Sequence, residues 1–158
     1  MQNEHQQTVV LIKPDGVQRG LVGEILHRFE RKGLKLVGLK MVHMTDELLE
    51  KWYAHHKDKP FFDNLKVFMK QTPVIASLWE GLDAVETVRK IAGVTKARAA
   101  EAGSVRGDLG MSIQLNLIHA SDSPDTAQKE RDLIFKPEEI FDYQSITETL
   151  IYSPDERK

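Results

Sequence analysis

The stretch Thr8–Gly16 reads TVVLIKPDG, an apolar and mostly β-branched run that stops at a turn sequence. Valine, isoleucine and threonine favour strands, whereas proline, aspartate and glycine favour turns. The stretch therefore predicts a strand up to Lys13, followed at once by a sharp change in the direction of the chain. The rest of the sequence decides what surrounds this strand.

Apolar periodicity predicts that strands and helices alternate along the chain. Further strands are expected over residues 34–42, 74–79 and 113–118, and helices around residues 21–29, 45–53, 65–68, 85–92 and 124–134. The order is a βαββαβ plan with additions, which predicts a ferredoxin-like α+β sandwich. Such a sandwich has a four-stranded antiparallel sheet, here expected to carry its helices on one face. The strand over 74–79 is almost wholly apolar and is expected at the centre of the sheet.

Several residues predict where helices begin and end. Gly33 is expected to cap the first long helix at its C-terminus, and Thr45 to cap the next helix at its N-terminus. Asp83, with a glutamate three residues later, resembles a capping box. Pro124 fits the first position of the last long helix.

Length and composition exclude several classes of protein. The chain has 158 residues, which suits one domain with a sizeable core. Its formal charge of −2 provides no positive field for nucleic acid or an anionic membrane, and the lack of cysteine removes disulfides and thiolate catalysis. No run approaches the roughly 18 apolar residues of a membrane span. We therefore expect one cytoplasmic domain over residues 1–158.

A tail follows the last predicted helix from about residue 137. It is rich in apolar side chains, among them Ile140, Phe141, Ile146 and Ile151. So apolar a segment is expected to pack on something, and a neighbouring subunit is one candidate.

His119 stands where the last predicted strand meets a Ser-Pro helix start. A neutral imidazole is a nucleophile and a base near physiological pH, and the N–H groups of a helix start can meet a phosphate. A lone histidine at a strand end is more often structural. The residue by itself leaves both interpretations open.

Phosphate chemistry also requires fixed cations, and Lys13, Arg89 and Arg106 are the candidates. Most lysines and arginines are simply solvated, so none of the three is decisive alone. The sequence contains neither a P-loop nor the motifs of protein kinases. His55 and His56 are adjacent and are not expected to share a helix face, which argues against a metal site made of histidines.

Four blocks in order resemble the nucleoside diphosphate kinase family, over nearly the whole chain. They are LIKPDGVQRGLVGEI at 11–25, HKDKPFF at 56–62, RGDLG at 106–110 and NLIHASDS at 116–123. The resemblance implies that His119 takes the γ-phosphate of a nucleoside triphosphate such as ATP and passes it to a nucleoside diphosphate. It also implies a ping-pong cycle that requires Mg²⁺, which is carried by the nucleotide phosphates rather than by protein ligands.

The resemblance implies a role for each matching residue. The catalytic set is His119, Glu130, Ser121 and Lys13, in which Glu130 orients the imidazole and Ser121 lies hydrogen-bonded nearby. Phosphate contacts are implied for Lys13, Tyr53, Arg89, Thr95 and Arg106, sugar contacts for Lys13 and Asn116, and stacking on the base for Phe61. Since every base has a π-face, such stacking predicts broad base specificity.

The chain departs from the family pattern at a few positions. Ala97 and Ala102 stand where prolines are frequent, Ala120 where glycine is common, and His55 where an acidic residue is frequent. Gln114-Leu115 replaces a common Gly-Arg pair. The long tail resembles that of hexamer-forming members, so a homohexamer is expected, with a homotetramer as the alternative.

One conflict concerns the last predicted strand. Strict alternation would put Asn116 and His119 on opposite faces of the sheet, whereas the resemblance places both in one site. Regular pairing must therefore end or bulge near Ile118.

Three other functions are compared with this one. Phosphotransfer to protein histidines or serines would use the same phosphohistidine. A nucleic-acid-binding sheet would need exposed aromatic residues and a basic face, and the predicted strands TVVLIK, LKLVGLKMV and IQLNLI contain no aromatic residue. A scaffold without activity would not need the complete set of site residues.

Overall fold

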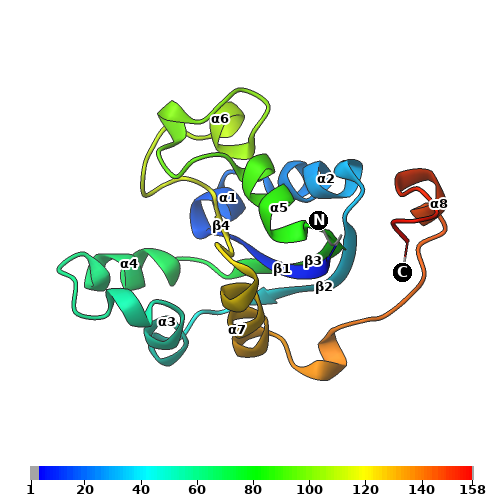
Figure 1. The fold of residues 1–158 in the computed structure, drawn as a ribbon. Helices are drawn as coiled ribbons and strands as arrows, with labels where there is room; N and C mark the ends of the chain where they lie inside the picture. Colours follow the sequence, from blue (N-terminus) through cyan, green and yellow to red (C-terminus); the bar gives the residue numbers. More distant parts are fainter. Residues whose placement is uncertain (1–3, 158) are drawn as a thin grey trace.

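The structure, a computed structural model, describes residues 4–157 (Figure 1). The strands are β1 (His5–Ile12), β2 (Lys35–Val42), β3 (Val74–Leu82) and β4 (Ile118–Ala120). The α-helices are α1 (Pro14–Gln18), α2 (Val22–Lys32), α3 (Asp46–Trp52), α4 (Phe62–Met69), α5 (Ala84–Ala92), α6 (Val105–Leu109), α7 (Pro124–Ile134) and α8 (Glu148–Ile151). Short 3₁₀ turns are η1 (Ala54–His56), η2 (Ala97–Ala99) and η3 (Pro137–Glu139). Within the described residues, no helix combines the length and apolar character that a membrane crossing requires.

The four strands form one antiparallel sheet in the order β2-β3-β1-β4. β1 pairs with β3 along its whole length, from His5 opposite Leu82 to Ile12 opposite Ile75. On its other side it pairs with β4, where Leu11 lies opposite His119. The predicted strand order along the chain and the central place of β3 are confirmed, and β4 forms one edge of the sheet.

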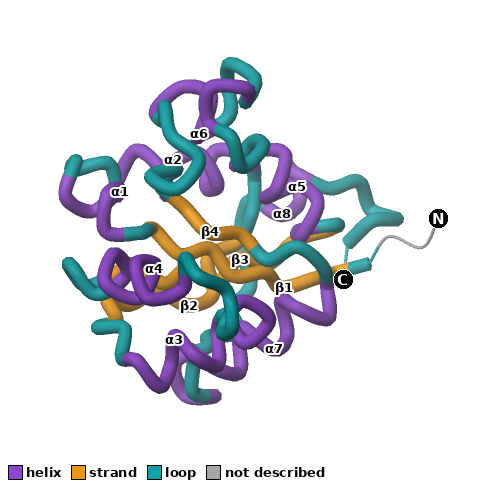
Figure 2. Tube along the Cα trace, turned by 90° about the vertical axis from the view of Figure 1, so that its left-hand side faces the viewer, coloured by secondary structure: helices purple, strands orange, loops and turns teal. Residues whose placement is uncertain are grey.

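Helices cover both faces of the sheet, so the expectation that they lie on one face is wrong (Figure 2). Val10 and Ile12 pack against α2 and α5 on one face, whereas Val9 and Leu11 pack against α3, α4 and α7 on the other. Because successive strand residues point to opposite faces, the uninterrupted apolar run of β1 requires cover on both sides.

Most of the predicted helix ends are confirmed. Gly33 caps α2 with a φ of 106°, and the Thr45 hydroxyl accepts the Leu48 N–H at 3.1 Å to cap α3. Pro124 occupies the first turn of α7. The capping box at Asp83 is wrong, because this residue has a φ of 47° and its side chain makes no cap hydrogen bond.

The last strand is shorter and later than predicted, since β4 covers Ile118–Ala120 and not residues 113–118. The chain turns at Leu117, which has a φ of 76°. The Asp15 carboxylate accepts the Leu117 N–H at 3.0 Å, and the Lys13 N–H donates to the Leu117 carbonyl at 2.8 Å. The turn sequence after β1 therefore anchors this bend, and pairing begins at Ile118.

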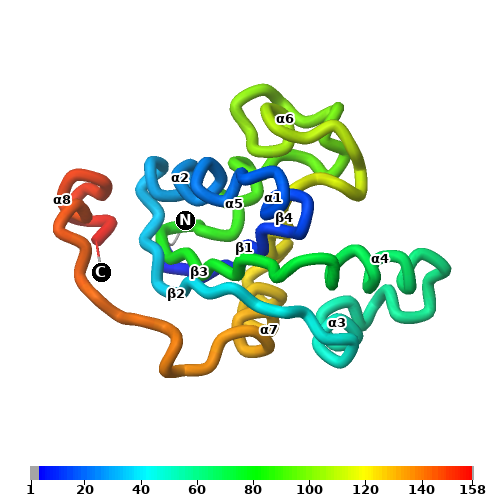
Figure 3. The backbone as a smooth tube through the Cα atoms, turned by 180° about the vertical axis from the view of Figure 1, so that it is seen from behind, coloured from blue at the N-terminus to red at the C-terminus, as the bar shows by residue number. Residues whose placement is uncertain are grey.

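The tail crosses to the far side of the molecule after α7, as the orange and red trace in Figure 3 shows. It is tied to β2 by the Phe141 N–H on the Val37 carbonyl at 2.8 Å and by the Tyr143 hydroxyl on the Leu36 carbonyl at 2.6 Å. With the end of α2 it encloses a cavity of about 460 Å³. Ile146 and Leu150 stay 92% and 85% exposed, so the tail packs only partly on its own chain.

Candidate active site

The candidate site lies at the β4 edge of the sheet, where the two helical layers meet. Its central residue is His119, which alternation along β4 directs to the same face as its partner Leu11. α3 and α7 cover that face. The Trp52 ring of α3 meets the imidazole edge to face, with ring centroids 5.3 Å apart. The imidazole therefore packs against the Trp52 ring and lies at the edge of the sheet.

Glu130 of α7 binds the imidazole directly. Its Oε2 lies 2.7 Å from His119 Nε2, and its Oε1 accepts the Ser121 hydroxyl at 2.6 Å. The carboxylate and Ser121 are buried, whereas His119 is 23% exposed. An ionised carboxylate accepts a hydrogen bond from a protonated Nε2, and this tautomer leaves the lone pair on Nδ1. The arrangement suits a histidine that acts as a nucleophile through Nδ1.

Two buried cations, Lys13 and Arg106, bind neutral acceptors. Lys13 Nζ donates to the Gln114 carbonyl at 2.8 Å and to Asn116 Oδ1 at 2.6 Å. Arg106 donates to the carbonyls of Gly93, Asn116 and Ile118 at 2.8, 3.2 and 2.6 Å. Carbonyl oxygens do not neutralise the positive charge that they bind, and such a pair of side chains attracts an anion.

The electrostatics of both side chains reflect their burial. Burial lowers the pKa of Lys13 to about 8, against the attraction of Asp15 and with the help of repulsion from Arg106. Burial and the nearby Arg89 lower the pKa of Arg106 to about 10. A phosphate would offset the cost of both buried charges.

The bend at Leu117 resolves the conflict between Asn116 and His119. The Asn116 amide donates to the Thr95 carbonyl at 3.0 Å and to the Ile113 carbonyl at 2.8 Å, while its oxygen holds Lys13. Because regular pairing starts only at Ile118, strand alternation does not apply to Asn116. The backbone is irregular just before Ile118, but the expectation that pairing ends there is wrong, because pairing begins at that residue.

Of the other predicted residues, Arg89 and Tyr53 lie close to this centre. Arg89 of α5 donates to the Ala120 carbonyl at 3.4 Å. Tyr53 follows α3, and burial together with the Glu130 charge raises the pKa of its hydroxyl. Phe61, which precedes α4, is set apart from the others and is 47% exposed. Its ring meets the His56 ring edge to face at 5.3 Å, and the His55 ring lies 3.9 Å from that of His56.

Two residues of the site were not among those predicted. Trp52 supports the imidazole, although its spacing in the sequence indicated only a core position. Asp15 holds the bend at Leu117, although it read as a turn residue. Ala120 pairs with Val10 in β4 and has no positive φ, so its Cβ fits. Among residues 4–157, no group of three or more histidines and carboxylates could hold a metal ion.

Comparisons with known proteins identify the family of the chain. The family model described as nucleoside diphosphate kinase matches residues 6–140. A nucleoside diphosphate kinase of Parabacteroides distasonis is 52% identical, covering 96% of this chain and 99% of its own length. Nucleoside diphosphate kinase A of Rattus norvegicus is 48% identical over 93% of this chain and 97% of its own.

A solved structure confirms the fold. A halophilic nucleoside diphosphate kinase from Halobacterium salinarum, in complex with CDP, superposes with a TM-score of 0.92. It is 44% identical and covers 95% of this chain and all of its own. The ferredoxin-like α+β fold is therefore confirmed. The chain belongs to the nucleoside diphosphate kinase family, whose members are phosphotransferases of nucleotide metabolism.

Proposed function

We propose that His119 carries the phosphoryl group between two nucleotides in a ping-pong cycle. In the first half, Nδ1 attacks the γ-phosphorus of a nucleoside triphosphate such as ATP; the N–P bond forms, the bond to the bridging oxygen breaks, and the diphosphate leaves. In the second half, a terminal phosphate oxygen of another diphosphate attacks the same phosphorus and the N–P bond breaks. The observation that carries the proposal is the 2.7 Å contact between Glu130 and Nε2.

Glu130 and Ser121 would control the imidazole. The carboxylate keeps the proton on Nε2 and stabilises the positive charge that the ring gains when Nδ1 is phosphorylated. The Ser121 hydroxyl binds the second carboxylate oxygen and so fixes its orientation. Both partners are buried, which keeps water from competing for these bonds.

The nucleotide would bind along the cations beside His119. Lys13, Arg89 and Arg106 face the phosphates, with Tyr53 and Thr95 as further phosphate contacts, and Lys13 and Asn116 reach the sugar hydroxyls. Phe61 is exposed, as a surface that stacks on any base must be. The Halobacterium relative, solved with CDP, supports a nucleoside diphosphate as ligand.

Family members generally act with a divalent metal, and we propose Mg²⁺ bound to the nucleotide phosphates as part of the substrate. It neutralises charge on the transferring group. We also propose that residues 1–158 act as one domain in the cytoplasm, with an extension from about residue 137. The exposed Ile146 and Leu150 of that extension support assembly into a homohexamer, with a homotetramer as the alternative.

Labelling with Mg²⁺ and γ-³²P-ATP tests the cycle. The protein is expected to retain acid-labile label on His119 and to lose it when any nucleoside diphosphate is added. His119→Ala should retain none, whereas His43→Ala, which removes an exposed histidine, should label normally. Label of the same kind and amount on His119→Ala would contradict the proposal.

A further inference from the structure

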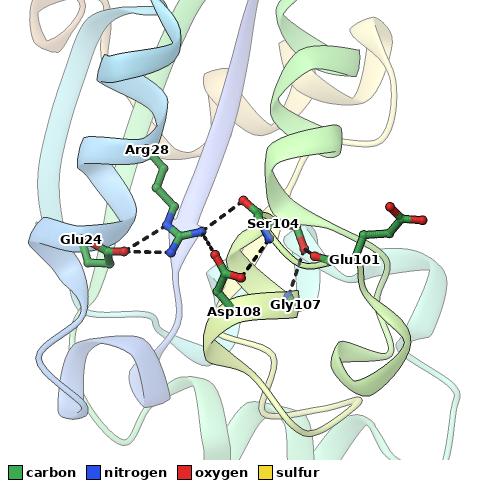
Figure 4. Close-up of polar contacts among 7 residues, drawn as sticks. Glu24, Arg28, Glu101, Ser104, Gly107 and Asp108 are labelled. Atoms are coloured by element: carbon green, nitrogen blue, oxygen red, sulfur yellow. Dashed lines mark hydrogen bonds and ion pairs between the residues drawn. The ribbon is translucent and has the colours of Figure 1, made fainter.

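One buried arginine of α2, Arg28, ties the loop that carries Arg106 to the body of the protein (Figure 4). Only 7% of Arg28 is exposed. Its Nη1 donates to Asp108 Oδ2 at 2.7 Å and to the Gly103 carbonyl at 3.2 Å. Its Nε and Nη2 donate to Glu24 Oε1 at 3.2 and 2.8 Å. A single guanidinium therefore bridges one helix and the loop.

The tip of the loop is tightly bonded within itself. Asp108 Oδ1 accepts the Gly103 N–H at 2.9 Å, and the Ser104 hydroxyl accepts the Gly107 N–H at 3.0 Å while donating to the Glu101 carbonyl at 2.6 Å. A Cβ on Gly107 would run into the Glu101 backbone. Residues 101–108 are therefore linked to one another by hydrogen bonds, and a bond to Asp108 acts on the whole segment.

α6 belongs to this unit and carries Arg106. Asp108 reaches outward to Arg28, while Arg106 reaches inward to the carbonyls of Asn116 and Ile118. α2 itself is fixed on the sheet, because Ile25 and Phe29 are fully buried in the core. Arg28 thus connects a helix that cannot shift to the element that presents the cation.

We propose that Arg28 is a positioning residue for the phosphate site, which sets the place of Arg106 through Asp108 and α6. This inference rests on the proposed function, in which Arg106 contacts the nucleotide phosphates. The loop has alanine at 97 and 102, where proline would limit the backbone, so a side-chain bridge bears more of the task of ordering it. A buried guanidinium with several partners does this better than an isolated pair of exposed side chains.

Arg28→Gln is the main test, and Arg31→Gln, on the exposed side of the same helix, is its matched control. Thermal melting establishes that each variant is folded at the assay temperature. Misplacing Arg106 should lower kcat/KM for nucleoside diphosphate by about tenfold, mainly through KM. Arg31→Gln should change neither parameter. A lower melting temperature with an unchanged KM for Arg28→Gln would overturn the proposal, because it would mean a purely structural role.

Two further variants keep the test informative if Arg28→Gln does not fold. Asp108→Asn leaves α2 intact and weakens the same bridge from the loop side, so KM should rise in the same direction. Arg28→Lys keeps the charge but lacks the planar fork that reaches Glu24 and Asp108 together, so rescue should be partial. Full rescue by lysine, or an unchanged KM in Asp108→Asn, would contradict positioning through the bridge.

A double-mutant cycle asks whether Arg28 acts through Arg106. In an Arg106→Ala background, Arg28→Gln should add little to KM, because the group that it positions is gone. If the KM increases of the two single variants multiply in the double variant, Arg28 does not act through Arg106. Labelling of His119 by saturating Mg²⁺-ATP is measured in every variant; if it persists while the KM effects are absent, the positioning role fails and the proposed function stands.

Discussion

Two parts of the candidate site hold their key groups by opposite means: the histidine cluster, which is His119 with Glu130, Ser121 and Trp52, and the cation pair, which is Lys13 and Arg106. His119 is held by side chains, with the Glu130 carboxylate at 2.7 Å and the Trp52 ring against it. Arg106 is held by three backbone carbonyls. A carboxylate changes the charge balance of its partner, whereas a carbonyl fixes a cation and leaves its charge for a ligand. In the proposed function, the first region tunes a reactive atom and the second receives negative charge.

Arg28 sharpens this contrast, because it binds the helix that carries Arg106 but its own charge is paired with carboxylates. It donates to two carboxylates, Glu24 and Asp108. The Gly103 N–H and the Arg28 guanidinium hold the pKa of the Asp108 carboxyl below its ordinary value. The choice of acceptor therefore separates an arginine that holds structure from one that is available to a substrate.

The largest effect is expected when the carboxylate charge of Glu130 is removed from the histidine cluster. Glu130→Gln should slow phosphorylation of His119 by Mg²⁺-ATP by about 10²-fold, because the amide no longer stabilises a positive ring. Nucleotide affinity should stay close to that of the wild type, since the cations are untouched. Rapid-quench measurement of the labelled enzyme gives the rate, and an unchanged rate would remove the orienting role of Glu130.

The cation pair should instead change its nucleotide affinity with pH. Lys13 has a pKa of about 8 in the folded protein without ligand, so its charge is lost as the pH rises above that value. Affinity for nucleoside diphosphate should then fall by up to about tenfold per pH unit. Lys13→Arg keeps its charge and should show a flatter titration between pH 7 and 9. The same pH dependence of affinity in the wild type and Lys13→Arg would mean that Lys13 is not the group that titrates.

The stability of the protein without ligand should instead increase as the pH rises. The pKa of Lys13 is lowered on folding from an ordinary 10.5, so between pH 8 and 10.5 the unfolded chain binds more protons. This contribution therefore raises the free energy of unfolding as the pH increases across that window. Denaturant melts of the wild type and Lys13→Met isolate it, because the variant lacks the titrating group.

The smallest effect concerns the backbone of the loop. Glu101 to Ser104 form a turn with a hydrogen bond of 3.2 Å, and Gly103 has a φ of 95°, which puts Ala102 where type II turns favour proline. Ala102→Pro should stabilise the protein by about 0.4–1 kcal/mol. Ala97→Pro should not, because the Ala97 N–H donates to the Ser112 carbonyl at 3.2 Å. Equal melting temperatures for the two variants would contradict this account.

Local patterns in the sequence predicted much of the fold. Gly33, Thr45 and Pro124 lie at the helix ends where they were expected, because capping depends on a few neighbouring residues. The strand predicted before His119 is wrong: its apolar residues alternate as in a strand, but the Leu117 N–H donates to the distant Asp15 carboxylate and not to a strand partner. The second helical layer was missed because periodicity identifies an apolar helix face but not which side of a sheet it covers.

The candidate site shows the same division. Composition and spacing gave His119, Lys13 and Arg106 as separate possibilities, and only the family resemblance grouped them. Trp52 and Arg28 carried no signal of their own in the sequence. In the sequence, Trp52 looks like any core residue of a helix. Arg28 looks like half of an ordinary surface ion pair with Glu24, four residues earlier. Their roles depend on contacts with residues far away in the chain, such as Asp108.

The position of β1 between β3 and β4 also has a consequence for how the chain is synthesised. β1 leaves the ribosome first, but its partners begin only at Val74 and Ile118. One edge of this central strand therefore stays unpaired until most of the chain has emerged, which is the interval in which strand edges aggregate. The last pairing to form is the one that brings His119 beside Leu11, so a nascent chain has no complete site before its sheet is closed.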